Sequence, residues 1–133
     1  GSHILPLSFY KKQYPNITYH PPCNNQQVLD IMHSCHILAL PSLVEGRAIV
    51  QLEALACGLP LIITPNTGGD DLIEKNTGFI VPIRSPHLIA EKIHWFFEHP
   101  QDLKAMHIYC KRKANTVSWD NFRSLLIQSI TNI

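Results

Sequence analysis

The chain has 133 residues, of which 45% are hydrophobic and only 16% are charged. This length suits one domain, on a prior of roughly 100–200 residues per domain, and the composition excludes a disordered chain. Eleven basic residues nearly balance ten acidic ones, which gives a net charge of +1 and excludes a basic nucleic-acid-binding surface. No apolar run approaches the ~20 residues of a membrane span. Four cysteines without a C-x-x-C pair suit a reduced, cytoplasmic setting.

Short apolar segments alternate with helical ones, which predicts an α/β domain with a Rossmann-like parallel sheet. The strands are predicted at residues 17–19, 36–40, 61–64 and 79–81. The strand at residues 36–40 is expected to be buried on both faces, as strands of such sheets usually are.

Capping residues mark the helices between these strands. Asn24 begins one helix, Gly58 ends the helix predicted for residues 47–57, and the Ser85-Pro86 pair begins another. A short helix follows Gly68-Gly69. Two more helices are expected near the C-terminus, at residues 102–114 and, after a Ser118 cap, 119–130.

Four strands are fewer than the five or six of a doubly wound sheet, and the surplus helices all lie toward the C-terminus. We therefore expect residues 1–133 to form a single partial domain that lacks its first strands. Its sheet should expose an edge that invites pairing. Gly1, Ser2 and His3 suit either a cloning remnant or native sequence.

Residues 41–58 carry the most informative pattern: a strand end, a tight loop and a helix start. The unpaired N–H groups of residues 48–50 should form an anion site beyond the carboxyl end of the strand. Glu45 and Glu53 flank this site, and carboxylates accept hydrogen bonds from pairs of sugar hydroxyls. Taken singly, Glu45 also fits an acidic residue that favours the dipole at the helix start, and Glu53 also fits a solvated helix face.

Together these residues resemble the E-x7-E signature of the group 1 (family 4) retaining glycosyltransferases, which have the GT-B fold. The letters "LPS" precede the first glutamate, "LEALACGLPLI" surrounds the second, and a Gly-Gly loop and "GFIVP" follow. The resemblance covers about residues 17–93. It implies the nucleotide-sugar-binding half of a two-domain enzyme that transfers a sugar to an acceptor hydroxyl with retention.

The resemblance also implies a role for each matching residue. Glu45 would be the catalytic residue that faces the donor sugar, and Glu53 would bind the ribose hydroxyls. Pro22, in the turn at residues 21–23, would lie against the base. The remaining donor-binding residues, which would surround the diphosphate or the sugar, are Gly46, Arg47, Ala48, Ile49, Val50, Gly68 and Gly69.

The family transfers sugar without an essential metal or other cofactor, so none is expected here. The implied partners are a nucleoside diphosphate sugar, a glycan or lipid-linked acceptor and the missing N-terminal domain, with no nucleic acid. A role in cell-surface polysaccharide or lipopolysaccharide synthesis, at the inner face of the membrane, follows from the resemblance alone. The fragment by itself is expected to be catalytically silent.

Two functional alternatives stay open: a non-catalytic nucleotide-binding or interaction module, and a hydrolase or phosphorylase on the same fold. A zinc site at His33, Cys35 and His36 is disfavoured because their spacing fits no closed zinc pattern. Arg47 in the first helical turn opposes the helix dipole, which predicts that Arg47 compensates the charge of the donor's diphosphate, whereas the plainer reading is a solvated side chain. Cys35 and Cys57, and the aromatic residues 95–97, are interpreted as packing residues.

Overall fold

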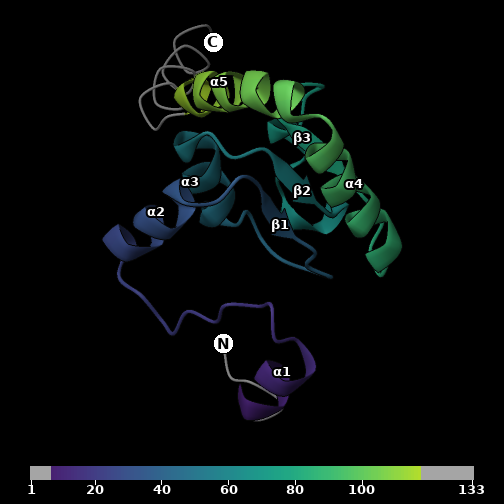
Figure 1. The fold of residues 1–133 in the computed structure, drawn as a ribbon. Coiled ribbons are helices and arrows are strands. Elements are labelled where there is room, and N and C mark those ends of the chain that lie inside the picture. The colour runs from purple at the N-terminus through teal and green to yellow at the C-terminus, as the bar shows by residue number, and fades with distance from the viewer. Residues whose placement is uncertain (1–6, 118–133) are drawn as a thin grey trace, which may run out of the picture.

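The computed structural model describes residues 7–117 as a small parallel sheet with helices on both faces (Figure 1). The sheet has the order β1-β2-β3 and contains Leu38–Leu40, Leu61–Ile63 and Gly78–Ile80. All pairs are parallel, with Leu61 of β2 opposite both Leu38 and Gly78. The predicted α/β class is confirmed.

Helices connect the strands and extend beyond them. They are α1 (Leu7–Gln13), α2 (Asn25–His33), α3 (Ile49–Cys57), α4 (Pro86–Glu98) and α5 (Pro100–Thr116). Two single 3₁₀ turns, Pro65–Thr67 and Asp70–Leu72, lie between β2 and β3. Residues 1–3, Ser118 and the helix predicted at 119–130 lie outside the described residues.

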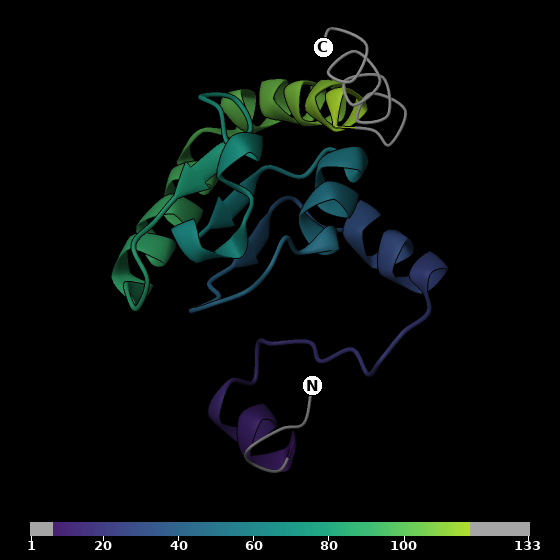
Figure 2. The same cartoon turned by 180° about the vertical axis from the view of Figure 1, so that it is seen from behind.

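The middle strand divides the core into two apolar clusters. Leu61 and Ile63 of β2 are buried on the side of α2 and α3, with Leu55 of α3. Ile62 points to the other side, where it joins Phe96 of α4 and apolar residues of α5. Because side chains alternate along a strand, three residues of β2 serve both clusters. Figures 1 and 2 show α2 and α3 on one face and α4 on the other.

The predicted caps at Asn24 and Gly58 are confirmed. The Asn24 side chain accepts a hydrogen bond from the Gln27 N–H at 2.9 Å, and the Gln27 side chain accepts one from the Asn24 N–H at 3.0 Å. This reciprocal pair satisfies two donors that the helix start would otherwise leave free. Gly58 ends α3 in the left-handed conformation, at φ 87°. The ring of His107 from α5 lies 2.5 Å from the Gly58 carbonyl oxygen.

The predicted strand at residues 17–19 is wrong. These residues lie in a segment without regular structure that joins α1 to α2 (Figure 1), and α1 lies away from the sheet in both views. The prediction that residues 36–40 are buried on both faces is also wrong. β1 is the edge strand of the described sheet, so Leu38 and Leu40 are only half-buried and Ala39 is exposed.

The packing roles predicted for Phe97 and Cys35 are wrong. Phe97 is 83% exposed, because the side of α4 that carries Phe96 faces the sheet. Trp95 and Phe96 both pack edge-on against Phe79 of β3, as expected. Cys35 is exposed, whereas Cys57, the last residue of α3, packs against the core cluster that contains Leu55 and Leu61.

No described helix combines the length and the apolar character that crossing a membrane requires.

Candidate functional site at the start of helix α3

Helix α3 begins without a side-chain cap. Its N-cap is Ala48, whose backbone is extended at φ −73° and ψ 116° and whose side chain cannot accept a hydrogen bond. The Gln51 N–H bonds to the Ala48 carbonyl at 3.1 Å. Within residues 7–117, no hydrogen bond satisfies the N–H groups of Ile49 and Val50. Two donors at the positive end of the helix dipole are therefore available to an anion.

Glu45 lies in the loop before α3, and hydrogen bonds hold this loop in place. Ser42 Oγ donates to Glu45 Oε2 at 2.7 Å, and the Glu45 N–H donates to the Asn66 carbonyl at 2.9 Å. In return, Asn66 Nδ2 donates to the Leu43 carbonyl at 2.8 Å, and Thr64 Oγ1 donates to the Ser42 carbonyl. The loop of Glu45 and the 3₁₀ turn at Pro65–Thr67 thus form one unit. The exposed Glu45 carboxylate faces solvent, where a ligand can reach it.

The Gly68-Gly69 turn lies directly against the start of α3. A Cβ atom on Gly68 would come within 3.2 Å of the backbone N and Cα of Arg47, and Gly68 has φ 61°. A Cβ atom on Gly69 would come within 1.7 Å of Gln51 Oε1. Only glycine allows an approach this close at both positions. The structure therefore brings together the Glu45 loop, the α3 start and the glycine turn.

Gln51 is a residue that the sequence analysis missed. Its side chain is fully buried, and Nε2 donates to the Thr67 carbonyl at 2.8 Å. Its Oε1 is buried without a donor among the described residues, a situation that costs about 1–3 kcal/mol. The one available signal was a polar side chain among the apolar residues of segment 49–57.

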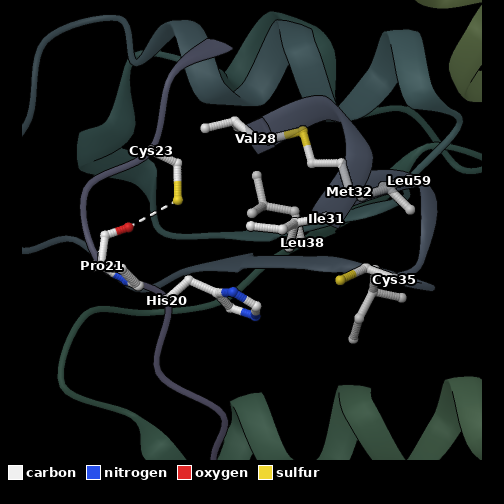
Figure 3. Close-up of a pocket in the computed structure, with 10 residues that line it drawn as sticks. His20, Pro21, Cys23, Val28, Ile31, Met32, Cys35, Leu38 and Leu59 are labelled. Atoms are coloured by element: carbon white, nitrogen blue, oxygen red, sulfur yellow. Dashed lines mark hydrogen bonds between the residues drawn. The ribbon is translucent and has the colours of Figure 1, made fainter. Parts of the chain in front are cut away.

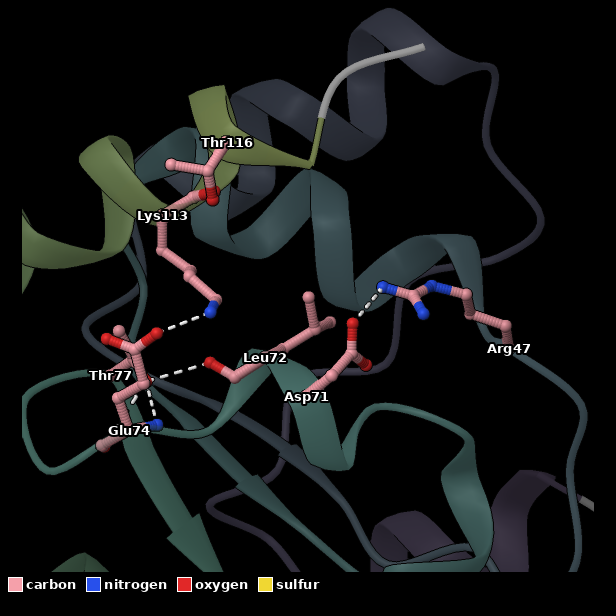
Figure 4. Close-up of polar contacts among 7 residues, drawn as sticks. All are labelled: Arg47, Asp71, Leu72, Glu74, Thr77, Lys113 and Thr116. Carbon is pink, nitrogen blue, oxygen red and sulfur yellow. Dashed lines mark hydrogen bonds and ion pairs between the residues drawn. The ribbon is translucent and has the colours of Figure 1, made fainter. Parts of the chain in front are cut away.

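Arg47 forms an ion pair with Asp71, the second acidic residue after the glycine turn (Figure 4). Arg47 Nη2 lies 3.0 Å from Asp71 Oδ2, and the two side chains are 43% and 59% exposed. An exposed pair of this kind contributes at most about 1 kcal/mol to stability. Arg47 thus pairs with an acid of the chain itself, and compensation of diphosphate charge by Arg47 stays a prediction.

Glu53 is half-buried, one helical turn beyond Ile49 on α3. Together with burial, which is the larger cause, its negative charge raises the pKa of the Cys57 thiol one turn further on. The helix thus carries a carboxylate on the same side as the exposed Ile49. That Glu45 and Glu53 share one ligand pocket stays a prediction.

A separate apolar pocket of about 320 Å³ lies between α2, the beginning of β1 and the segment before α2 (Figure 3). Pro21 and Cys23 line it, and the Cys23 thiol donates to the Pro21 carbonyl at 2.8 Å. Pro22 and α3 do not contribute to its lining. Contact between Pro22 and a base stays a prediction.

Among residues 7–117, no group of three or more His, Cys, Asp or Glu is arranged to hold a metal ion.

The sequence profile of the family described as "Glycosyl transferases group 1" matches residues 10–113. The chain belongs to this family. The match includes the loop of Glu45, all of α3 and the glycine turn. Membership of the expected group 1 glycosyltransferases is therefore confirmed for most of the chain.

Curated relatives agree with this assignment, and a solved structure shares the fold. The D-inositol 3-phosphate glycosyltransferase of Streptomyces bingchenggensis (strain BCW-1) is 29% identical over 106 residues, which are 78% of this chain and 23% of the relative. The enzyme of the same name from Rhodococcus jostii (strain RHA1) is 29% identical over 115 residues, 85% of this chain and 25% of the relative. Sucrose-phosphate synthase from Thermosynechococcus elongatus superposes with a TM-score of 0.79 at 18% identity, covering 95% of this chain and 34% of that one.

These comparisons confirm a Rossmann-like α/β unit of a GT-B glycosyltransferase. The chain spans about a quarter of the length of the curated relatives it matches.

Proposed function

We propose that this chain is the donor-binding part of a retaining, family 4 glycosyltransferase that uses a nucleoside diphosphate sugar. The observation that carries the proposal is the start of α3. Among the described residues, the Ile49 and Val50 N–H groups make no hydrogen bond, and the start of α3 that carries them follows the Glu45 loop and lies against the Gly68-Gly69 turn. Family membership supports sugar transfer, and this geometry supports the place where the donor binds.

The diphosphate of the donor would bind at the α3 start. Backbone N–H groups and the helix dipole favour a phosphate oxygen there, and no side chain of residues 7–117 competes for the Ile49 and Val50 donors. The backbone of Gly46 and Ala48 would complete the cradle, since Gly46 has open space around it. During transfer, the bond between the anomeric carbon and a diphosphate oxygen breaks, and negative charge grows on the diphosphate. Fixed dipoles at this position would stabilise that charge.

The two glutamates would bind the sugars on either side of the diphosphate. Glu45 would accept hydrogen bonds from the transferred sugar and orient its anomeric carbon, because its loop is held by Ser42 and Asn66. Glu53 would accept hydrogen bonds from the ribose hydroxyls, and Pro22 would lie against the base. Gly68 and Gly69 would form the wall beside the transferred sugar.

The acceptor would be bound by a further domain, the N-terminal one of the GT-B pair. The short coverage of the curated relatives supports this proposal. β1 is the edge strand of the described sheet, and its outer edge would pair with additional strands of the donor-binding domain itself. The acceptor class we propose is a glycan or a lipid-linked sugar, reached at the cytoplasmic side of a membrane without a requirement for a metal.

Arg47 provides a prediction about charge in the donor site. Replacing Arg47 with alanine should weaken binding of a nucleoside diphosphate by about 3- to 10-fold at low salt, because a cation near the diphosphate is lost. The difference should shrink at high salt, where exposed charges are screened. Calorimetric titration at two salt concentrations measures both effects. Asp71→Ala is the matched control, since it removes the ion pair but keeps the cation. An unchanged affinity and salt dependence in Arg47→Ala would contradict the role of Arg47.

A thermal-shift panel tests the proposed function. Uridine, guanosine and adenosine diphosphates are added to the chain and to its Glu53→Gln variant. A diphosphate present at 100 times its dissociation constant should stabilise the folded chain by about 2.7 kcal/mol, which raises the Tm by several degrees. One of the three should do so, and the Glu53→Gln variant should respond less. No response to any of them would favour a non-catalytic interaction module instead.

A further inference from the structure

Gln51 connects α3 to the glycine turn through its buried side chain. The residue is 0% exposed, and its Nε2 donates to the carbonyl oxygen of Thr67 at 2.8 Å. Thr67 is also 0% exposed, and it immediately precedes Gly68. The amide therefore fixes the end of the 3₁₀ turn against the first turn of the helix.

The other end of the same amide fills the space that a side chain on residue 69 would take. A Cβ atom on Gly69 would lie 1.7 Å from Gln51 Oε1 and 2.7 Å from Cδ. Oε1 has no hydrogen-bond donor among the described residues. Its position is thus set by the Thr67 bond and by packing on Gly69. The size and orientation of this amide determine how closely the glycine turn approaches α3.

The turn that Gln51 holds also carries the loop of Glu45. The carbonyl oxygen of Asn66, the residue before Thr67, accepts the Glu45 N–H at 2.9 Å. Gly68 lies against the backbone of Arg47, two residues after Glu45. Movement of the turn would therefore displace Glu45. In contrast, the N–H groups of Ile49 and Val50 belong to α3 itself and make no hydrogen bond to the turn.

We propose that Gln51 is a positioning residue that acts through the glycine turn and the Glu45 loop to shape the part of the site that takes the donor's sugar. This inference rests on the proposed function. It divides the site into two parts: the helix start binds the diphosphate, and the Gln51-anchored loops recognise the sugar. Gln51 itself is too deeply buried to touch the donor.

The test compares two ligands on the same variants of the full chain. Each variant is titrated by calorimetry with uridine diphosphate and with UDP-glucose, and likewise with guanosine diphosphate and with GDP-mannose. The affinities within each pair of ligands are then compared. Gln51→Met keeps the length of the side chain but removes the bond to Thr67. It should leave the affinity for the free diphosphate within about 2-fold and weaken the matching nucleotide sugar at least 5-fold. Leu52→Ala, on the next residue of α3, is the control for a general loss of stability, and its two affinities should change by one common factor.

A second pair of variants tests the contact between Gln51 and Gly69 directly. Gly69→Ala should lower the Tm, because its methyl group would overlap Gln51 Oε1. Adding Gln51→Ala should recover much of that Tm by opening space, while preference for the nucleotide sugar stays lost. This double variant also provides the answer if Gln51→Met does not fold.

The outcomes separate the inference from the proposed function. If wild type binds neither diphosphates nor nucleotide sugars, the proposed function fails. If wild type binds both but Gln51→Met weakens them equally, Gln51 is a merely structural residue and the inference is wrong. A double variant that fails to recover the Tm lost in Gly69→Ala, or that regains the wild-type preference for the nucleotide sugar, would also overturn it.

Discussion

Replacing Glu53 with glutamine should weaken nucleoside diphosphate binding by about 10- to 100-fold. A hydrogen bond to a charged acceptor contributes about 1.5–3 kcal/mol, and each 1.4 kcal/mol is a factor of ten in affinity. The half-buried Glu53 carboxylate is one turn beyond the free N–H groups of α3. The substitution should also lower the raised pKa of the Cys57 thiol, because the neighbouring negative charge is gone. Faster alkylation of Cys57 at alkaline pH, with an unchanged far-UV circular dichroism spectrum, is therefore expected for a folded Glu53→Gln variant.

Glu98→Gln is the control for this measurement, since it removes an exposed carboxylate from α4 rather than from α3. Calorimetric titration of both variants with the same diphosphate gives the comparison. Equal affinities in Glu53→Gln and Glu98→Gln would mean that Glu53 does not contact the ligand.

Replacing Gly78 with alanine should reduce the free energy of unfolding by about 3 kcal/mol or more. Gly78 begins β3 opposite Leu61 of β2, with φ 153°. A Cβ atom there would lie 2.1 Å from the Leu61 carbonyl oxygen, which is backbone and cannot move aside without breaking the strand pairing. A strained φ and a steric overlap each cost roughly 1–3 kcal/mol.

Urea denaturation of Gly78→Ala and of Gly46→Ala provides the measurement and its control. Gly46 has no atom within 4 Å of the position that a Cβ would take. Its substitution should therefore change the unfolding free energy by no more than about 0.5 kcal/mol. If the two variants unfold at the same urea concentration, the close contact between β2 and β3 is misplaced.

Local signals in the sequence predicted helices α2, α3 and α4, but not α1. Asn24 and Gly58 satisfy or end a helix through their own side chain or backbone, so their effect needs no distant partner. The Ser85-Pro86 pair correctly places the start of α4. In contrast, α5 begins at Pro100, two residues earlier than expected, because proline is favoured in the first turn of a helix.

The errors concern features that depend on distant neighbours. Residues 17–19 have the composition of a strand, but a strand forms only where another strand pairs with it. β1 is apolar enough for burial on both faces, but it lies at the edge of the described sheet. Phe97 was assigned to the core because it follows Phe96, although a shift of one residue turns a side chain by about 100° around a helix.

In the candidate site, too, local features could be predicted from the sequence, whereas contacts between distant residues could not. The position of the free N–H groups followed from a helix start after a strand, and the order of motifs brought the glycine turn into consideration. The role of Gln51 could not be predicted, because it depends on a contact with Thr67 and Gly69, 16 and 18 positions away in the chain. The pairing of Arg47 with Asp71 also depends on how closely the turn folds back onto α3.

The most direct test of the account is a ¹H–¹⁵N NMR titration of the chain with the diphosphate that stabilises it. We predict that the amide signals of Ile49 and Val50 shift most, because their N–H groups would gain a phosphate acceptor. The signals of Gly46 and Glu53 should follow. Shifts confined to the apolar pocket beside α2, with Ile49 and Val50 unmoved, would contradict donor binding at the start of α3.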